Sequence, residues 1–412
     1  MTGNQARPRW LKAALVIVAA LVPAADAIAL WDDKLELFIS ETLVHDSNVF
    51  RISDRVDPLT VIGSPSKSDT YFITSPGFNL NIPYSRQRFL AGIRWDLARY
   101  DRFKVLDFDG HEGRAIWQWQ AGNDWSGQLG YSESLALQSL ANSQTSILAG
   151  QPNALETQRA FLNANWRMTP RWTWRGDLGR TEQENELPVQ KLNNIVIENA
   201  GLALLYATPL KNQVGVGVRV EEGSYPNRTV QADAISDSYQ QQNIDGIFEY
   251  TVTGATRLIA RVGWVNRDHD QLSQRDFDEG TYNFNLEWRP GPRTTVNGIA
   301  RREVSALDNT LSRFVLLTGF ALSPTWQVTE KITINLNMEY SSRDYLVDPS
   351  LLEPQSGGTR TDWVRFAGLR VFYRPLRALT LGASLFFESR SSTFPFGDYE
   401  ATGGSVSARI GF

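Results

Sequence analysis

Residues 332–340 read ITINLNMEY, in which apolar and polar side chains alternate without a break. Successive side chains of an extended strand point to opposite faces, so this stretch has one apolar and one polar face. The same alternation recurs at 214–221, 282–288 and 379–388, and alternating segments reach 9 to 15 residues. Soluble strands average about five or six residues. Long strands with one apolar face are typical of a transmembrane β-barrel, whose apolar side meets lipid.

The composition narrows the class of protein further. The 412 residues include 41 Lys and Arg against 45 Asp and Glu, a balance that does not suit a nucleic-acid binder. The chain has no cysteine, which excludes disulfides, thiolate catalysis and Cys-ligated metals. Beyond the N-terminal leader, no apolar run approaches the roughly 18 residues of a membrane-spanning helix. We therefore expect an all-β chain.

The N-terminus has the order of a secretory signal peptide. Three basic residues precede an apolar core at 13–22, and Ala25-Asp26-Ala27 provides a small-residue cleavage site. We expect residues 1–27 to be this signal peptide and residues 28–412 to form a single transmembrane β-barrel domain in the bacterial outer membrane.

The connections between the alternating segments are alternately short and long. Eight short turns, such as those at 253–255, 290–292 and 323–330, separate nine longer polar stretches, among them 47–68. This arrangement predicts an antiparallel barrel of about 18 strands (16 to 18) with both termini on the short-turn side. Short periplasmic turns and long extracellular loops are the pattern of bacterial outer-membrane barrels.

Aromatic residues recur beside the short turns. They are Phe78, Trp119, Trp166, Tyr206, Tyr250, Trp288, Tyr373 and Phe412. Rings of this kind are favoured at the level of the lipid headgroups, so they predict a periplasmic aromatic girdle. The last strand places Val406, Ala408, Ile410 and Phe412 on one face, which resembles the terminal signal read by the barrel assembly machinery.

The polar faces of the strands carry many charges. The side chains predicted to line the pore are Arg94, Asp96, Arg114, Arg167, Arg175, Arg219, Glu221, Arg261, Glu287, Arg301, Glu339, Arg370 and Arg409. One interpretation is a conduit in which Arg donors bind carboxylate or hydroxyl groups of a passing glycan. The other is that opposite charges pair across strands and only rigidify a wet barrel. Residues 47–68 could form either a surface loop or a plug.

Three histidines could serve acid–base chemistry. His45, His111 and His269 lie close to Asp residues near the predicted extracellular rim, but no flanking motif links any of them to a particular Ser. The spacing of the acids at 268–278 does not follow the twelve-residue calcium loop. We therefore expect solvated loop histidines, no catalytic residue, no metal site and no cofactor.

The opening of the mature chain resembles a known family. DDKLELF at 32–38, ETL at 41–43 and HDSNVFR at 45–51 are similar to the start of EpsL-type outer-membrane β-barrel porins, which are encoded with exosortase-associated exopolysaccharide clusters. The DSNVFR run at 46–51 is the most specific part. The resemblance implies a role in exopolysaccharide biosynthesis or export and supplies no catalytic residue.

Three functions are compatible with these features. The first is a channel, and not an enzyme, for export or assembly of a secreted exopolysaccharide. Its expected partners are outer-membrane lipid, the barrel assembly machinery, the exopolysaccharide, and periplasmic or inner-membrane polysaccharide export proteins, with no nucleic acid. The alternatives are a general small-solute porin and a surface-exposed hydrolase that uses one of the rim histidines.

The loop pattern predicts the result of proteolysis on intact cells. A protease added outside is expected to cut within long segments such as 139–154 or 343–358, because the short turns lie in the periplasm. The fragments are identified by mass spectrometry. Cleavage at 290–292 from outside would invert the topology.

Overall fold

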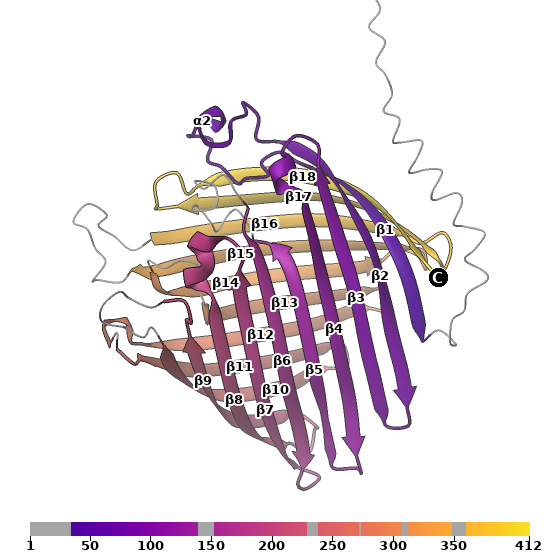
Figure 1. Ribbon diagram of the computed structural model, residues 1–412. Coiled ribbons are helices and arrows are strands. Elements are labelled where there is room, and N and C mark those ends of the chain that lie inside the picture. Colours follow the sequence, from indigo (N-terminus) through magenta and orange to yellow (C-terminus); the bar gives the residue numbers. More distant parts are fainter. Residues whose placement is uncertain (1–33, 139–151, 229–237, 272, 306–311, 348–359) are drawn as a thin grey trace, which may run out of the picture.

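The computed structural model is a closed β-barrel (Figure 1). It describes residues 34–138, 152–228, 238–271, 273–305, 312–347 and 360–412, and the predicted signal peptide lies outside them. Within these residues there are eighteen strands: β1 Leu35–Asp46, β2 Asp69–Tyr84, β3 Gln87–Tyr100, β4 Phe108–Ala121, β5 Trp125–Leu137, β6 Ala154–Arg167, β7 Trp172–Asn185, β8 Ile195–Ala207, β9 Gln213–Ser224, β10 Tyr239–Thr253, β11 Thr256–His269, β12 Phe277–Gly291, β13 Thr294–Ser305, β14 Ser312–Gln327, β15 Ile332–Val347, β16 Arg360–Tyr373, β17 Leu379–Ser392 and β18 Tyr399–Gly411.

Helical structure is confined to short pieces of the long loops. They are α2 Pro58–Ile62, η2 Lys104–Leu106, η3 Pro188–Asn193 and η4 Ser273–Arg275. Among the helical segments of the described residues, none has the length and apolarity to cross a membrane.

Backbone pairing closes the sheet. Each strand pairs antiparallel with its sequence neighbours, and β1 pairs with both β2 and β18. The β1–β18 register runs from Phe38 opposite Gly411 to Asp46 opposite Gly403. A sheet edge exposed to lipid would leave N–H and C=O groups unpaired, at a cost of about several kcal/mol each, and closure removes that edge. The prediction of a transmembrane antiparallel barrel with 18 strands is confirmed.

The two ends of the barrel differ in their connections. Eight hairpins at one end are joined by two to five residues, whereas the nine connections at the other end have six residues or more. The structure differs from the sequence-based prediction at 323–330, because β14 continues to Gln327 and the turn is 328–331. Pro324 lies inside β14. It has no N–H to donate, and the β14–β15 ladder skips it and resumes at Thr325 while the chain stays extended.

The outer face carries the apolar side chains. Val214, Val216, Val218 and Val220 are all exposed on β9, as expected for a wall that lipid covers. Aromatic rings pair beside the short turns: Trp125 stacks on Trp166 with ring centroids 5.3 Å apart, and Trp172 lies 4.9 Å from Tyr206. Trp326 is also exposed beside its turn.

Polar side chains appear on the outer face toward the long-loop end. The Glu133 carboxylate accepts hydrogen bonds from Tyr131 at 2.7 Å and from His111 at 3.0 Å, and Arg180 donates to Glu198 at 2.6 Å. One carboxylate lies farther from the long-loop end, at the middle of β1. Glu41 shares the outward phase of Leu37 and Leu43, and accepts a hydrogen bond of 2.7 Å from the Thr74 hydroxyl. Each outward polar group in this set is therefore hydrogen-bonded within the wall.

Residues 47–68 connect β1 and β2 at the long-loop end of the barrel and lie along its rim. Phe50 and Ile52 pack with Phe103 and Leu106 of the next loop in a small buried cluster, and α2 lies beyond the strand ends (Figure 1). Farther along, Arg55 donates a hydrogen bond to Asp398 in the last loop, which holds the pKa of that carboxyl below its ordinary value.

The DSNVFR motif joins this loop to the last two strands. Arg51 binds Asp46 at 2.9 Å and Glu388 of β17 at 3.2 Å. The Asn48 side-chain amide donates to the carbonyl of Glu400 in β18 at 3.0 Å. We call these five residues the rim clasp. It bridges the first and last strands at the long-loop end, so the motif has a structural role here.

Deletion of Phe412 is expected to impair barrel assembly. Its N–H donates to the Leu37 carbonyl at 2.8 Å, and its carbonyl accepts from the Leu37 N–H at 3.2 Å, so the deletion shortens the closing ladder in lipid. We expect the heat-modifiable fraction in purified outer membranes to fall by more than about half. Leu210→Ser, in an exposed turn, is the control. Assembly of the deletion variant at the control level would contradict the role of this strand end.

Candidate functional site

Contacts between strands that are not neighbours identify the inner face of the wall. Arg175 on β7 lies 3.4 Å from Glu249 on β10, across β8 and β9. Arg301 on β13 reaches Glu339 on β15 at 3.4 Å, across β14. Side chains can meet over an intervening strand only on the concave side of a curved sheet. With this phase, the register places all the side chains predicted to line the pore on the inner wall. That they line a conducting path stays a prediction.

Several of these charges pair along the wall. Arg94 contacts Asp96 at 3.0 Å and Glu112 at 3.1 Å, and Arg409 contacts Glu36 at 2.9 Å. Solvent-accessible ion pairs of this kind contribute about 0–1 kcal/mol each, so their main effect is to fix the positions of the side chains. Around these residues, the interpretation that opposite charges pair across strands therefore applies.

Five inward arginines behave differently. Within the residues that the structure describes, no hydrogen bond or ion pair engages the guanidinium groups of Arg114, Arg159, Arg167, Arg261 and Arg370. Two of them, Arg159 on β6 and Arg261 on β11, lie in the same cavity of about 450 Å³, which opens on the lumen. The wall thus has donors available to a solute in one defined place.

The cavity, which we call the arginine pocket, is built from β6, β7, β8, β9 and β11. It combines guanidinium groups with side-chain amides and one aromatic ring: Arg159, Phe161, Asn163, Arg175, Arg219 and Arg261. Arg219 contacts Asp177 at 3.5 Å, but its Nε is buried without a hydrogen-bond partner in the described structure. An unsatisfied buried donor of this kind costs about 1–3 kcal/mol.

Local packing positions the ring of the pocket. The ring of Phe161 on β6 lies against Gly130 on β5, where a Cβ would collide with the ring. Arg159, two residues earlier on the same face, places its guanidinium carbon 5.6 Å from the centroid of this ring. The small residue on β5 therefore makes room for an aromatic surface on the inner wall.

The sequence identified only part of this pocket. Arg175, Arg219, Glu221 and Arg261 were predicted, whereas Arg159 and the asparagines at 163, 165 and 199 were missed. The signal for Arg159 was present, because it shares the phase of Arg167 on β6. The asparagines gave no such signal, since neutral amides are common on any wet face.

The three histidines lie apart from one another. His45 binds the Thr70 hydroxyl at 2.9 Å on the outer face, and His111 binds Glu133 on the outer face of β4. His269 lies at the long-loop end of β11. Its backbone N–H donates to the Asp276 carboxylate at 2.7 Å, and its ring Nδ1 lies 3.4 Å from the same oxygen. In the described stretches, no group of three or more His, Asp or Glu is placed to hold a metal ion.

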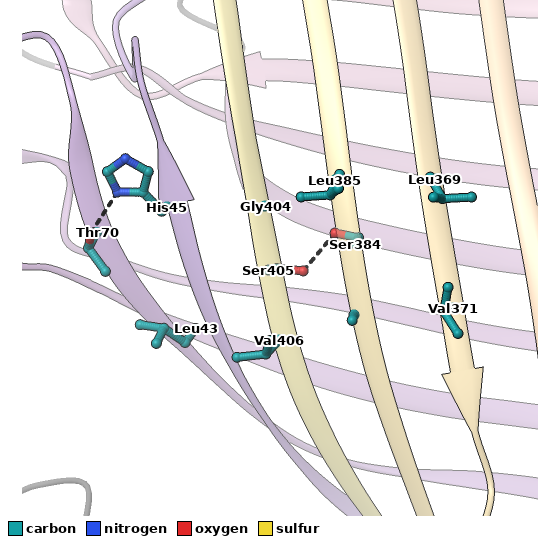
Figure 2. Close-up of a pocket in the computed structure, with 11 residues that line it drawn as sticks. Leu43, His45, Thr70, Leu369, Val371, Ser384, Leu385, Gly404, Ser405 and Val406 are labelled. Atoms are coloured by element: carbon teal, nitrogen blue, oxygen red, sulfur yellow. Dashed lines mark hydrogen bonds between the residues drawn. The ribbon is translucent and has the colours of Figure 1, made fainter.

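A second depression, of about 530 Å³, lies on the outer wall between β16 and β1 (Figure 2). Gly404 and Ala383 leave a gap between the ridges formed by Leu43, Val406 and Leu385. Its surface is almost entirely hydrocarbon, so it presents few groups to a polar solute and belongs to the lipid-facing wall. The arginine pocket is therefore the candidate functional site.

Comparison with known proteins supports a β-barrel porin family. Residues 213–412, which form β9 to β18, match the family model described as "Putative beta-barrel porin 2". The match spans just under half of the chain. No curated protein matches the sequence. Together with the lipid-facing wall, the match identifies a porin-like β-barrel of the bacterial outer membrane.

Solved structures with a similar barrel are distant in sequence. OpdK, an outer membrane protein from Pseudomonas aeruginosa, is 8% identical with a TM-score of 0.47 over 92% of this chain and 99% of that chain. A mutant of the ferric enterobactin receptor from Pseudomonas aeruginosa is 10% identical with a TM-score of 0.45 over 91% and 80%. A bacterial polysaccharide outer membrane secretin is 10% identical with a TM-score of 0.33 over 91% and 98%. These likenesses say nothing about the solute of this chain.

Charge reversal in the arginine pocket is expected to change ion selectivity. Replacing Arg219 and Arg261 by Glu puts negative charge on the wall, which excludes anions and admits cations. The permeability ratio for cations over anions, measured from reversal potentials in planar bilayers, should rise by about twofold or more. Arg180→Glu, on the outer face, is the matched control. An unchanged reversal potential in the double variant would show that the pocket does not border the conducting path.

Proposed function

We propose that this barrel is a conduit through which a secreted exopolysaccharide crosses the outer membrane. The observation that carries the proposal is the arginine pocket, where unpaired guanidinium groups, side-chain amides and an aromatic ring share one inward cavity. Sugars are bound by this combination, because hydroxyls need several fixed hydrogen-bond partners and the ring face needs an apolar surface. An 18-stranded barrel also leaves room for an aqueous path beside the wall.

The choice of basic residue supports a role in recognition. Within the strand ranges given above, no lysine occurs, and every strand cation other than histidine is arginine. Arginine presents several donors in a rigid plane and is less strongly hydrated than lysine, so it can hold hydroxyl or carboxylate oxygens with two parallel hydrogen bonds. A wall needed only for its positive charge could use either residue.

The resemblance of residues 32–51 to EpsL-type porins supports the same cargo, since those proteins are encoded with exopolysaccharide clusters. In this proposal the barrel performs no chemistry on the glycan. Periplasmic or inner-membrane export proteins deliver the chain to the short-turn end, and the glycan leaves between the long loops. The barrel assembly machinery inserts the protein, and lipid covers the outer wall.

A general small-solute porin is the second candidate. It is favoured by the pairs of opposite charge on the inner wall, such as Arg94 with Glu112 and Arg301 with Glu339. Paired charges of both signs give a wet wall with little preference for one class of solute. The unpaired arginines gathered in one pocket are the feature that this alternative does not use.

Deletion of the gene is expected to abolish surface glycan while synthesis at the inner membrane continues. The reason is that, in this proposal, the barrel is the route by which the finished chain crosses the outer membrane. Immunoblots of surface and periplasmic fractions, with complementation by the intact gene, provide the measurement. Normal surface glycan in the deletion strain, together with reduced uptake of small solutes, would replace the export proposal by the second candidate.

A further inference from the structure

We infer that the arginine pocket binds carboxylate-bearing sugars, so that the exported chain is an acidic glycan. This inference rests on the proposed function, because a conduit for glycan is its starting point. It goes beyond that function by naming the chemical class of the cargo.

The pocket holds more positive than negative charge. Four arginines line it, at 159, 175, 219 and 261, against two acids, Asp177 and Glu221. Asp177 is engaged by Arg219 at 3.5 Å. Glu221 accepts a hydrogen bond from the Tyr239 hydroxyl at 3.0 Å and lies 3.8 Å from Arg267, above the pocket on β11. Both acids of the pocket therefore have basic partners, and they leave Arg159 and Arg261 uncompensated.

The free donors suit a carboxylate. The guanidinium groups of Arg159 and Arg261 have no hydrogen bond or ion pair in the described part of the chain. A guanidinium group can give two parallel N–H bonds to the two oxygens of a planar carboxylate, and such charge-assisted bonds are about twice as strong as neutral ones. A neutral hydroxyl takes one of these bonds and leaves the excess charge unbalanced.

The rest of the pocket suits a sugar rather than a small inorganic anion. The Phe161 ring is fixed against Gly130 and provides an apolar surface, while Asn163, Asn165 and Asn199 offer amide donors and acceptors for ring hydroxyls. The volume of about 450 Å³ lies within the range of pockets that bind organic ligands. Because the pocket opens on the lumen, a sugar bound there can remain part of a longer chain.

Transport also requires that the site release its ligand. Arg175 and Arg219 are each held by an acid of the wall, Glu249 at 3.4 Å and Asp177 at 3.5 Å. These acids compete with a carboxylate of the glycan for the same guanidinium groups. Two arginines of the pocket have no acidic partner and two already pair with an acid of the wall. The pocket can therefore attract an acidic sugar without retaining it, as conduction requires.

Current block in planar bilayers tests the inference. The full-length barrel is exposed from the periplasmic side to oligogalacturonate, which carries one carboxylate per sugar, or to neutral malto-oligosaccharide of equal length. We expect the acidic oligomer to block the current at about tenfold lower concentration than the neutral one. Equal block by the two oligomers would overturn the acidic class but leave the glycan conduit standing. Absence of block by either oligomer in an open channel would contradict both proposals.

Two variants locate the effect. Arg159→Gln together with Arg261→Gln should remove the preference for the acidic oligomer, whereas Arg114→Gln, which removes an unpaired inward arginine outside the pocket, should keep it. Heat-modifiable mobility and single-channel conductance establish that each variant is assembled. An assembled double variant that still prefers the acidic oligomer by the wild-type factor would show that the pocket does not bind it.

Discussion

The hydrogen bonds between β1 and β18 are the constraint on which the rest of the molecule depends. In lipid, an open sheet cannot leave its edge groups unpaired, so the chain must return to its first strand. Once the backbone hydrogen bonds are formed in this way, the side chains on the two faces of each strand can differ independently. The outer face needs only hydrocarbon, as on β9, and the inner face is free to carry the arginines and asparagines that water can solvate.

Closure also creates contacts that a flat sheet would not have. Curvature brings Arg175 on β7 within reach of Glu249 on β10, although two strands lie between them. The arginine pocket arises in the same way, because its side chains come from strands as far apart as β6 and β11. Its geometry is therefore a property of the barrel and of its strand number, and no single hairpin contains it.

These relations explain what the sequence could predict. Alternation reports the phase of one strand, so the strand number, the loop pattern and the inward side chains such as Arg219 and Arg261 were readable along the chain. Ion pairs cannot be read from one strand where the two partners lie on different hairpins. The sequence around Arg261 does not show that it lacks an acidic partner, and that around Arg175 does not show that Glu249 is its partner. Glu41 was not singled out because its hydrogen bond from Thr74 crosses to the next strand. The extended path through Pro324 was missed because proline usually ends a strand.

The rim clasp has a consequence for the order of folding. Arg51 and Glu388 are 337 positions apart in the chain, and Asn48 and the carbonyl of Glu400 are 352 apart. Contacts of such separation carry a large loop-closure entropy unless the intervening strands are already paired, so we expect them to form late. The rim clasp can therefore form only when all eighteen strands are present and β18, with β17 beside it, lies next to β1. A truncated or misordered barrel would leave Arg51 without Glu388 and the buried Asn48 amide without the Glu400 carbonyl, so the motif at the end of β1 tests whether the last two strands are in place.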